Sequence, residues 1–266
     1  MEQLVGLVVG LLAGTHIATW GMYKDAPHEG FRRYHRSILT AAVIGPLIVT
    51  VVPRSWRSPG DLVLLYGLTY ICERGATEFY KVFIRNESQS KYFIPMQFHV
   101  FGRVVPPGPF RQAAAAGYTV VFVGAFVALH FARAWDPGLP RWLTFGLLGS
   151  SVGWLIACAG AFKDAPIEGF ETLKFFRSPV IAGVWAALVS PFTNSYLLAA
   201  MVGAGYSVAT IETYKTFFFP NKPRGKFAGK PISFPEHLQT RQRFVPVYAF
   251  IWLVMLGTLF LAHSRA

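Results

Sequence analysis

Two charged segments, 139 residues apart, carry the same acids and bases at the same spacing. Residues 22–31 read MYKDAPHEGF and residues 161–170 read AFKDAPIEGF. Carboxylate oxygens are suitable ligands for Mg²⁺, and carboxylates also serve as general bases. The predicted metal ligands are the four acids of these segments, Asp25, Glu29, Asp164 and Glu168.

A second repeated segment adds one acid and one base from each part of the chain. ATEFYKVF (76–83) and TIETYKTF (210–217) align Glu78 with Glu212. In both segments a lysine follows the acid by three residues, a spacing that places the two side chains on one face of a helix. The predicted catalytic acids are Asp25, Glu29, Glu78, Asp164, Glu168 and Glu212.

Lysines and arginines surround these acids, which favours a phosphate-binding site because such cations form charge-assisted hydrogen bonds with phosphate oxygens. A fainter third echo, KYFIPMQF (91–98) and KFAGKPISF (226–234), adds two lysines. The predicted phosphate-binding residues are Lys24, Arg36, Lys81, Lys91, Lys163, Arg177, Lys215 and Lys226. Acids that hold Mg²⁺ and bases that hold phosphate would together grip a magnesium-bridged phosphate.

A structural interpretation of the first repeated segment stays open beside the chemical one. Asp25 stands where a helix N-cap is expected, and Pro27 suits the first turn of a new helix. Under this interpretation the segment is a capped helix start whose charges lie at a membrane surface, and its duplication only copies a structural device.

The composition indicates an integral membrane protein. Hydrophobic residues make up 53% of the 266 residues and charged residues only 14%, whereas soluble domains carry roughly 25% charged residues. A membrane-spanning helix needs about 20 predominantly apolar residues. We predict an all-α protein with eight transmembrane helices, over residues 3–20, 37–53, 61–77, 113–132, 142–162, 178–193, 195–211 and 244–262.

The echoes occur in the same order in two halves of four predicted helices each. Because four is an even number, both halves cross the membrane in the same sense. This predicts two parallel four-helix repeats related by a pseudo-twofold axis along the membrane normal. The predicted division is a first repeat over 1–134, a linker over 135–140 and a second repeat over 141–266.

Basic residues predict the orientation of these helices. The loops after the first, third, fifth and seventh predicted helices hold 20 of the 25 lysines and arginines, and cytoplasmic loops are enriched in such residues. We therefore expect a multi-pass protein of the inner (cell) membrane with both termini outside and the large loops cytoplasmic. The net charge of +12 is then a topology signal, and no nucleic-acid partner is predicted.

These features favour a lipid-modifying transferase that acts on a phosphorylated or diphosphate-linked lipid at the cytoplasmic face, with Mg²⁺ as cofactor. Its expected partners are membrane lipids and a phosphorylated lipid or activated head-group substrate. A lipid or small-anion transporter (or flippase) and a non-catalytic membrane subunit are the alternatives. His16, inside the first apolar run, is expected to hydrogen-bond to a neighbouring helix.

Overall fold

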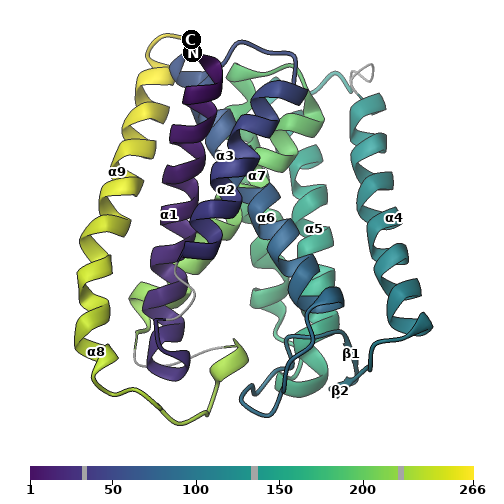
Figure 1. Cartoon of the computed structure of the whole chain (residues 1–266). Helices are drawn as coiled ribbons and strands as arrows, with labels where there is room; N and C mark the ends of the chain where they lie inside the picture. The colour runs from purple at the N-terminus through teal and green to yellow at the C-terminus, as the bar shows by residue number, and fades with distance from the viewer. Residues whose placement is uncertain (32–34, 133–136, 221–224) are drawn as a thin grey trace.

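The computed structural model describes residues 1–31, 35–132, 137–220 and 225–266, and these form an all-α bundle (Figure 1). Long apolar runs favour helices of this length, and proline is tolerated inside membrane helices, as at Pro46 of α2 and Pro179 of α6. Eight helices of 17 or more residues lie within the described ranges: α1 (Glu2–Glu29), α2 (His35–Val51), α3 (Pro59–Phe79), α4 (Pro109–Phe131), α5 (Arg141–Glu168), α6 (Thr172–Val189), α7 (Tyr196–Thr213) and α9 (Phe244–His263).

Short elements connect the long helices at one end of the bundle. α3 and α7 each continue into a π-helical turn, η1 and η4, and a small antiparallel hairpin follows η1. We call this end the loop end; both termini lie at the opposite end (Figure 1). The short elements of the loop end are η1 (Tyr80–Ile84), β1 (His99–Val100), β2 (Arg103–Val104), η4 (Tyr214–Phe218), η5 (Gly225–Phe227), α8 (His237–Thr240) and η6 (Arg241–Arg243). The short helix η3 (Ser190–Phe192) lies at the opposite end, where Phe192 packs against His263 near the C-terminus.

The two central helices, α3 and α7, pack against each other and join the halves of the chain. α1 and α2 pack on α3, whereas α5 and α6 pack on α7. The last long helix of each half then crosses over, because α9 packs on α1 and α3 while α4 packs on α5 and α7. The two sequence halves are therefore interlocked. The predicted linker begins with residues 135 and 136, which lie outside the described residues.

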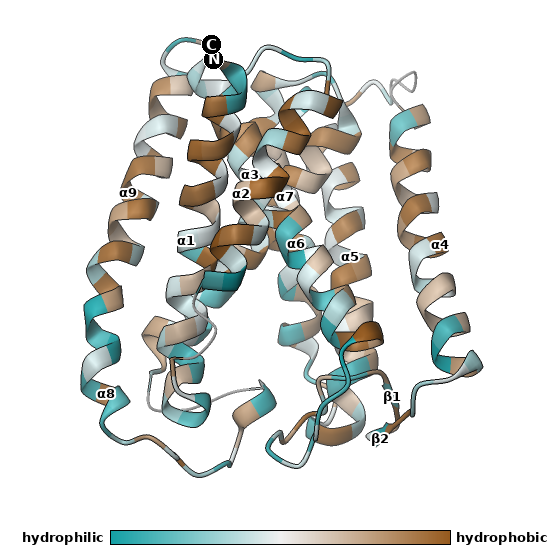
Figure 2. Ribbon diagram, in the orientation of Figure 1, coloured by the Kyte–Doolittle hydropathy of each residue, from teal (hydrophilic) through white to brown (hydrophobic). Residues whose placement is uncertain are grey.

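Within the part of the chain that the structure describes, five helical segments are long and apolar enough to cross a membrane. They are α1, α4, α5, α6 with its extension to Phe192, and the segment His237–His263 that contains α9; α2 is apolar but shorter. Hydrophobic residues line these helices, and hydrophilic residues gather at the loop end (Figure 2). The prediction of a membrane protein is thus supported for five of the eight expected spans. α3 carries four charged residues within its length, which is tolerable because much of it is buried in the bundle.

Close packing of small residues holds α1 against α2 and α5 against α6. An alanine methyl at Gly14 would lie 2.6 Å from the Cα of Ile38, and one at Gly153 would lie 2.5 Å from the Cα of Pro179. Membrane helices use small residues at such crossings because dispersion contacts replace the hydrophobic effect between them. Gly14 and Gly153 correspond in the two sequence halves, so the helix crossing is duplicated along with the charged segments.

The prediction that Asp25 and Pro27 begin a new helix is wrong. α1 continues through Pro27 to Glu29, and α5 continues through Pro166 to Glu168. A proline this deep in a helix removes the hydrogen bond to the carbonyl four residues earlier. In α1 that carbonyl belongs to Tyr23, and the guanidinium of Arg241 donates a hydrogen bond to it at 3.5 Å.

Both helices end instead at the glycine of the repeated segment. Gly30 has φ 73° and Gly169 has φ 84°, and each donates its N–H to the alanine carbonyl four residues earlier at 2.9 Å. Glycine adopts positive φ without the steric cost that a Cβ brings. The segment therefore terminates two long helices, and its acids lie in their last turns.

The expectation for His16 is confirmed. Its side chain is fully buried in the bundle, and its Nδ1 atom is hydrogen-bonded to the hydroxyl of Tyr66 in α3. The ring also packs against Tyr248 and Trp252 of α9, with centroids 4.2 and 5.3 Å away. A cluster of aromatic side chains thus fills the middle of the bundle between α1, α3 and α9.

Candidate functional site

All six predicted acids lie at the loop end. Asp25 and Glu29 close α1, Asp164 and Glu168 close α5, and Glu78 and Glu212 lie in the last turns of α3 and α7. This common location follows from the fold, because α1, α3, α5 and α7 all run toward the loop end (Figure 1). The acids nevertheless divide into separate ion-pair groups.

One group joins the two halves of the chain. The Nζ atom of Lys24 in α1 lies 3.5 Å from Oε2 of Glu212 in α7, and Lys215 approaches the other oxygen of Glu212 at 3.6 Å. The corresponding acid of the first half, Glu78, is in contact with Arg74 and Lys81. Each acid therefore has two cationic neighbours, which stabilise its ionised form in a part of the protein that is largely shielded from water.

A second group ties the long loops to the end of α1. Lys226 lies 2.9 Å from Asp25 and 3.2 Å from Glu29, and Lys91 lies 2.9 Å from Glu29. The hydroxyl of Tyr92 donates to Glu29 at 2.9 Å, and burial together with the negative charge of Glu29 raises the pKa of that hydroxyl. The two lysines of the third sequence echo thus converge on one carboxylate.

The third group belongs to the second half. Lys174 of α6 binds both acids at the end of α5, with its Nζ atom 3.1 Å from Asp164 and 2.8 Å from Glu168. Lys163, which was predicted to bind phosphate, instead directs its Nζ atom to the sulfur of Met96 at 3.6 Å. Asp164 and Glu168 therefore face α6, whereas Asp25 and Glu29 face the loops.

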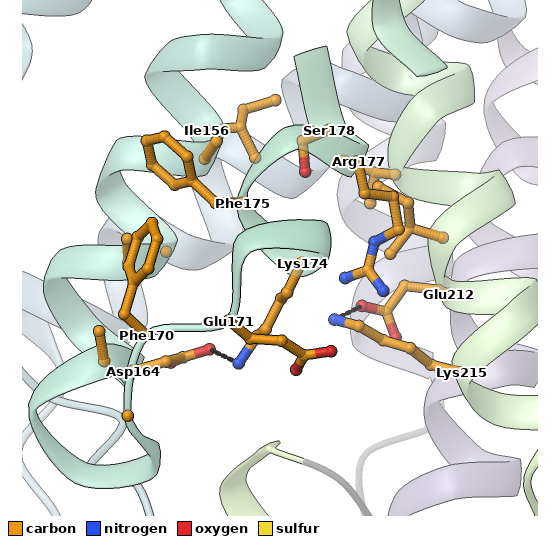
Figure 3. Close-up of a pocket in the computed structure, with 17 residues that line it drawn as sticks. Ile156, Asp164, Phe170, Glu171, Lys174, Phe175, Arg177, Ser178, Glu212 and Lys215 are labelled. Carbon is orange, nitrogen blue, oxygen red and sulfur yellow. Dashed lines mark ion pairs between the residues drawn. The ribbon is translucent and has the colours of Figure 1, made fainter. Parts of the chain in front are cut away.

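A pocket of about 160 Å³ opens between the ends of α5, α6 and α7 (Figure 3). Its lining includes four of the predicted residues, Asp164, Arg177, Glu212 and Lys215. Figure 3 shows the guanidinium group of Arg177 directed toward Glu212 and Lys215, while Ile156, Phe170 and Phe175 form the opposite wall. The pocket thus combines a charged side with an apolar side.

This lining includes none of the seven predicted residues of the first half, which are Lys24, Asp25, Glu29, Arg36, Glu78, Lys81 and Lys91. Asp25, Glu29 and Glu78 are held in the ion pairs described above, and Arg36 lies near the start of α2. This pocket does not bring together acids of both halves, because Asp164 and Glu212 both belong to the second half and the first half contributes only the contact from Lys24 to Glu212.

Two lysines at the loop end have unusual acidity. Burial lowers the pKa of Lys81 to about 7, against 10.5 for an ordinary lysine. Burial also lowers the pKa of Lys215, and the positive charges of Lys24 and Arg177 lower it further. A lysine that loses its proton near neutral pH is able to serve as a general base.

The arrangement of acids does not suit Mg²⁺. Among the residues that the structure describes, no group of three or more His, Cys, Asp or Glu side chains is placed to hold a metal ion. Each predicted metal ligand instead has a lysine within ion-pair distance, and that positive charge repels a divalent cation. The magnesium cofactor stays a prediction from sequence, and no chemical step is assigned to it here.

Sequence reasoning missed Lys174, Arg74 and Tyr92. A signal for Lys174 was present, because Lys174-x-x-Arg177 echoes Arg33-x-x-Arg36 in the first half; Arg33 itself lies outside the described residues. Arg74 and Tyr92 stand next to repeated residues but are not repeated themselves, so comparison of the two halves could not select them.

Comparison of the chain with protein-family models, with curated proteins and with solved structures finds no match.

Proposed function

We propose that this protein binds the phosphorylated head group of a membrane lipid at its loop end and transfers a chemical group to or from that lipid. The observation that carries the proposal is the α5–α6–α7 pocket, in which three cations, placed beside acids of the same lining, lie opposite an apolar wall. A phosphorylated lipid has the same two chemistries, an anionic head and an apolar body.

The cations of the pocket supply the head-group contacts. Lys174 and Arg177 come from α6 and Lys215 comes from the π-helical turn η4, and all three line the same pocket. Arginine and lysine form charge-assisted hydrogen bonds with phosphate that are roughly twice as strong as neutral ones. On binding, the phosphate replaces part of the contacts that these cations make with Asp164 and Glu212.

Lys215 supplies the proton chemistry that a transfer reaction needs. Its ammonium group can stabilise negative charge that develops on the phosphate, and its lowered pKa makes it a better proton donor to a leaving oxygen than an ordinary lysine. The repeated partner, Lys81, has a lowered pKa as well, and each lysine pairs with the acid three residues before it, Lys81 with Glu78 and Lys215 with Glu212.

We also propose eight spans arranged as two parallel repeats about an axis along the membrane normal, with the loop end in the cytoplasm. The repeated helix ends at Gly30 and Gly169, the paired π-helical turns, and the equivalent glycine contacts support the repeat. The enrichment of lysine and arginine at the loop end supports the orientation.

The transporter alternative requires a polar path through the bundle. The centre is instead occupied by aromatic side chains, since Tyr66, Tyr70 and Tyr206 are 0–2% exposed. We therefore favour the transferase.

A genetic experiment tests the proposed activity. In cells that lack the chain, lipid mass spectrometry is expected to show accumulation of one phosphorylated lipid, which wild-type protein returns to its normal level. Lys215→Met is expected not to restore that level. Arg57→Gln, a change at the opposite end of the bundle where Arg57 pairs with Glu2 at 3.2 Å, serves as the control and is expected to restore it. Unchanged phosphorylated lipids in the deletion, or full restoration by Lys215→Met, would contradict the proposal.

A further inference from the structure

The duplicated segments differ at two positions that decide whether a pocket forms. Because Glu78 aligns with Glu212, Arg74 aligns with Val208 and Thr77 aligns with Ile211. The second half thus has two branched apolar side chains where the first half has an arginine and a threonine.

In the first half, Arg74 occupies the space between α1 and α3. Its guanidinium contacts Glu78, lies 3.9 Å from Glu73 and stands over the ring of Trp20 in α1 at 5.3 Å. The side chain is mostly shielded, at 13% exposure. An arginine with two acidic partners and an aromatic partner is firmly fixed, because buried ion pairs are costly to break once formed.

In the second half, Val208 and Ile211 leave the corresponding space open. Both line the pocket together with Ile156 and Phe175. They provide an apolar back wall directly beside Arg177 and Lys215, and they place no charge there that would compete for an anionic head group.

The rim of the pocket leads to the outer face of the bundle. Phe170 lines the pocket and is 62% exposed, and the neighbouring Leu173 is 82% exposed. Large exposed apolar side chains of a membrane helix face lipid. An amphiphile held by its head in the pocket can therefore extend its chain past these residues into the bilayer.

We propose that the second-half pocket is the single lipid-binding site of the chain, that it takes a lipid phosphomonoester, and that the first half is a structural copy locked by Arg74. This inference rests on the proposed function and assigns it to one half. The phosphate is bound by Lys174, Arg177 and Lys215, and the start of the acyl chain packs on Val208, Ile211 and Phe175.

Native mass spectrometry of the full chain in detergent tests the inference, with phosphatidate as the probe. Wild-type protein is expected to bind one phosphatidate per chain. Phosphatidylcholine provides a lipid without a phosphomonoester, and glycerol 3-phosphate and inorganic phosphate provide the phosphate without a lipid. All three should bind at least about tenfold more weakly than phosphatidate. Phosphatidylcholine loses a charge-assisted hydrogen bond, and the other two lose the apolar contact.

Two substitutions separate the pocket from its counterpart. Val208→Arg is expected to weaken phosphatidate binding at least about tenfold by filling the pocket. The fold should tolerate it, because position 208 precedes Glu212 by four residues, as Arg74 precedes Glu78. Val208→Leu keeps the wall apolar, so its affinity for phosphatidate is expected to stay within about threefold of the wild-type value, a smaller change than the tenfold loss expected for Val208→Arg. If Val208→Arg does not fold, the pair Arg177→Gln and Arg36→Gln decides, with a loss expected for Arg177→Gln alone.

The possible results distinguish the inference from the function on which it rests. Failure of wild-type protein to bind phosphatidate would overturn both. Two phosphatidates per chain, equal losses in Arg36→Gln and Arg177→Gln, or retained binding in a folded Val208→Arg variant would overturn the single-site inference and leave head-group binding in place. Equal affinity for inorganic phosphate and phosphatidate would overturn the assignment of an amphiphile.

Discussion

Replacing Gly153 with alanine places a methyl group 2.5 Å from the Cα of Pro179 and 2.7 Å from the carbonyl oxygen of Ser178. Both neighbours are backbone atoms, so α5 and α6 must move apart. Overpacking of this kind costs about 1–3 kcal/mol. At about 2–4 °C per kcal/mol for a chain of this size, the unfolding temperature should fall by about 2–12 °C.

The repeat provides a second test and matched controls. In the first half, Gly14→Ala brings its methyl 2.6 Å from the Cα of Ile38 and 2.7 Å from the carbonyl oxygen of Ser37, so it should cost a similar amount. Gly21 and Gly160 also correspond to each other, and a methyl group at either has no atom outside its own helix within 4 Å. Alanine at these two positions should be neutral or stabilise the protein by up to about 1 kcal/mol, because alanine favours helix.

The assay is thermal unfolding of the four purified variants in one detergent, followed by the fluorescence of the buried tryptophans. The expected order is a lower unfolding temperature for Gly14→Ala and Gly153→Ala, and an unchanged or higher one for Gly21→Ala and Gly160→Ala. Indistinguishable unfolding temperatures in all four variants would refute the close helix crossings. A loss at Gly153 without a loss at Gly14 would refute their equivalence.

Three further predictions concern the loop end and the core. Lys81→Met should abolish a rise in stability between pH 7 and 10. The pKa of Lys81 is about 7 in the folded chain against 10.5 for an ordinary lysine, so in this range the unfolded chain keeps a proton that the native chain has lost, and stability rises with pH. Thermal unfolding across this pH range measures the effect, and an identical slope of stability against pH in the variant would contradict the assignment. Lys226→Met removes the cation shared by Asp25 and Glu29. Because a charged hydrogen bond contributes about 1.5–3 kcal/mol, limited proteolysis of the 225–243 segment should become at least about tenfold faster. An unchanged cleavage rate would show that other contacts hold the loops. His16→Leu leaves the hydroxyl of Tyr66 without its imidazole partner and should destabilise the protein by about 1–3 kcal/mol, and the double change with Tyr66→Phe should recover part of the loss in the same unfolding assay.

Hydrophobic patterning predicted the helices well and the ends of two of them poorly. The first apolar run, 3–20, indicated a helix that stops before the charged segment, yet α1 runs to Glu29. Pro27 does not end α1, because the backbone carbonyl of Tyr23 that it leaves without a helical hydrogen bond accepts one from Arg241, 218 residues away in the sequence. No local pattern reveals such a long-range partner.

The candidate site was predictable in its location but not in its connections. Repetition correctly selected acids that meet at one end of the bundle, since equivalent helices run in the same direction. Comparison of the two halves could not show that Lys91 and Lys226 both form ion pairs with Glu29. It also could not show that Lys174 pairs with Asp164 and Glu168. Duplicated residues acquire different partners once neighbouring positions diverge, and Arg74 against Val208 is the clearest case.

The contact between α3 and α7 limits how the molecule can work. A Cβ atom on Gly205 would lie 2.1 Å from the carbonyl oxygen of Gly67, so the two backbones touch with no side chain between them. Such a junction leaves little room for one half to tilt relative to the other. Under the proposed function, a lipid should therefore enter sideways from the surrounding leaflet into the pocket already formed between α5, α6 and α7, and the product should leave by the same route.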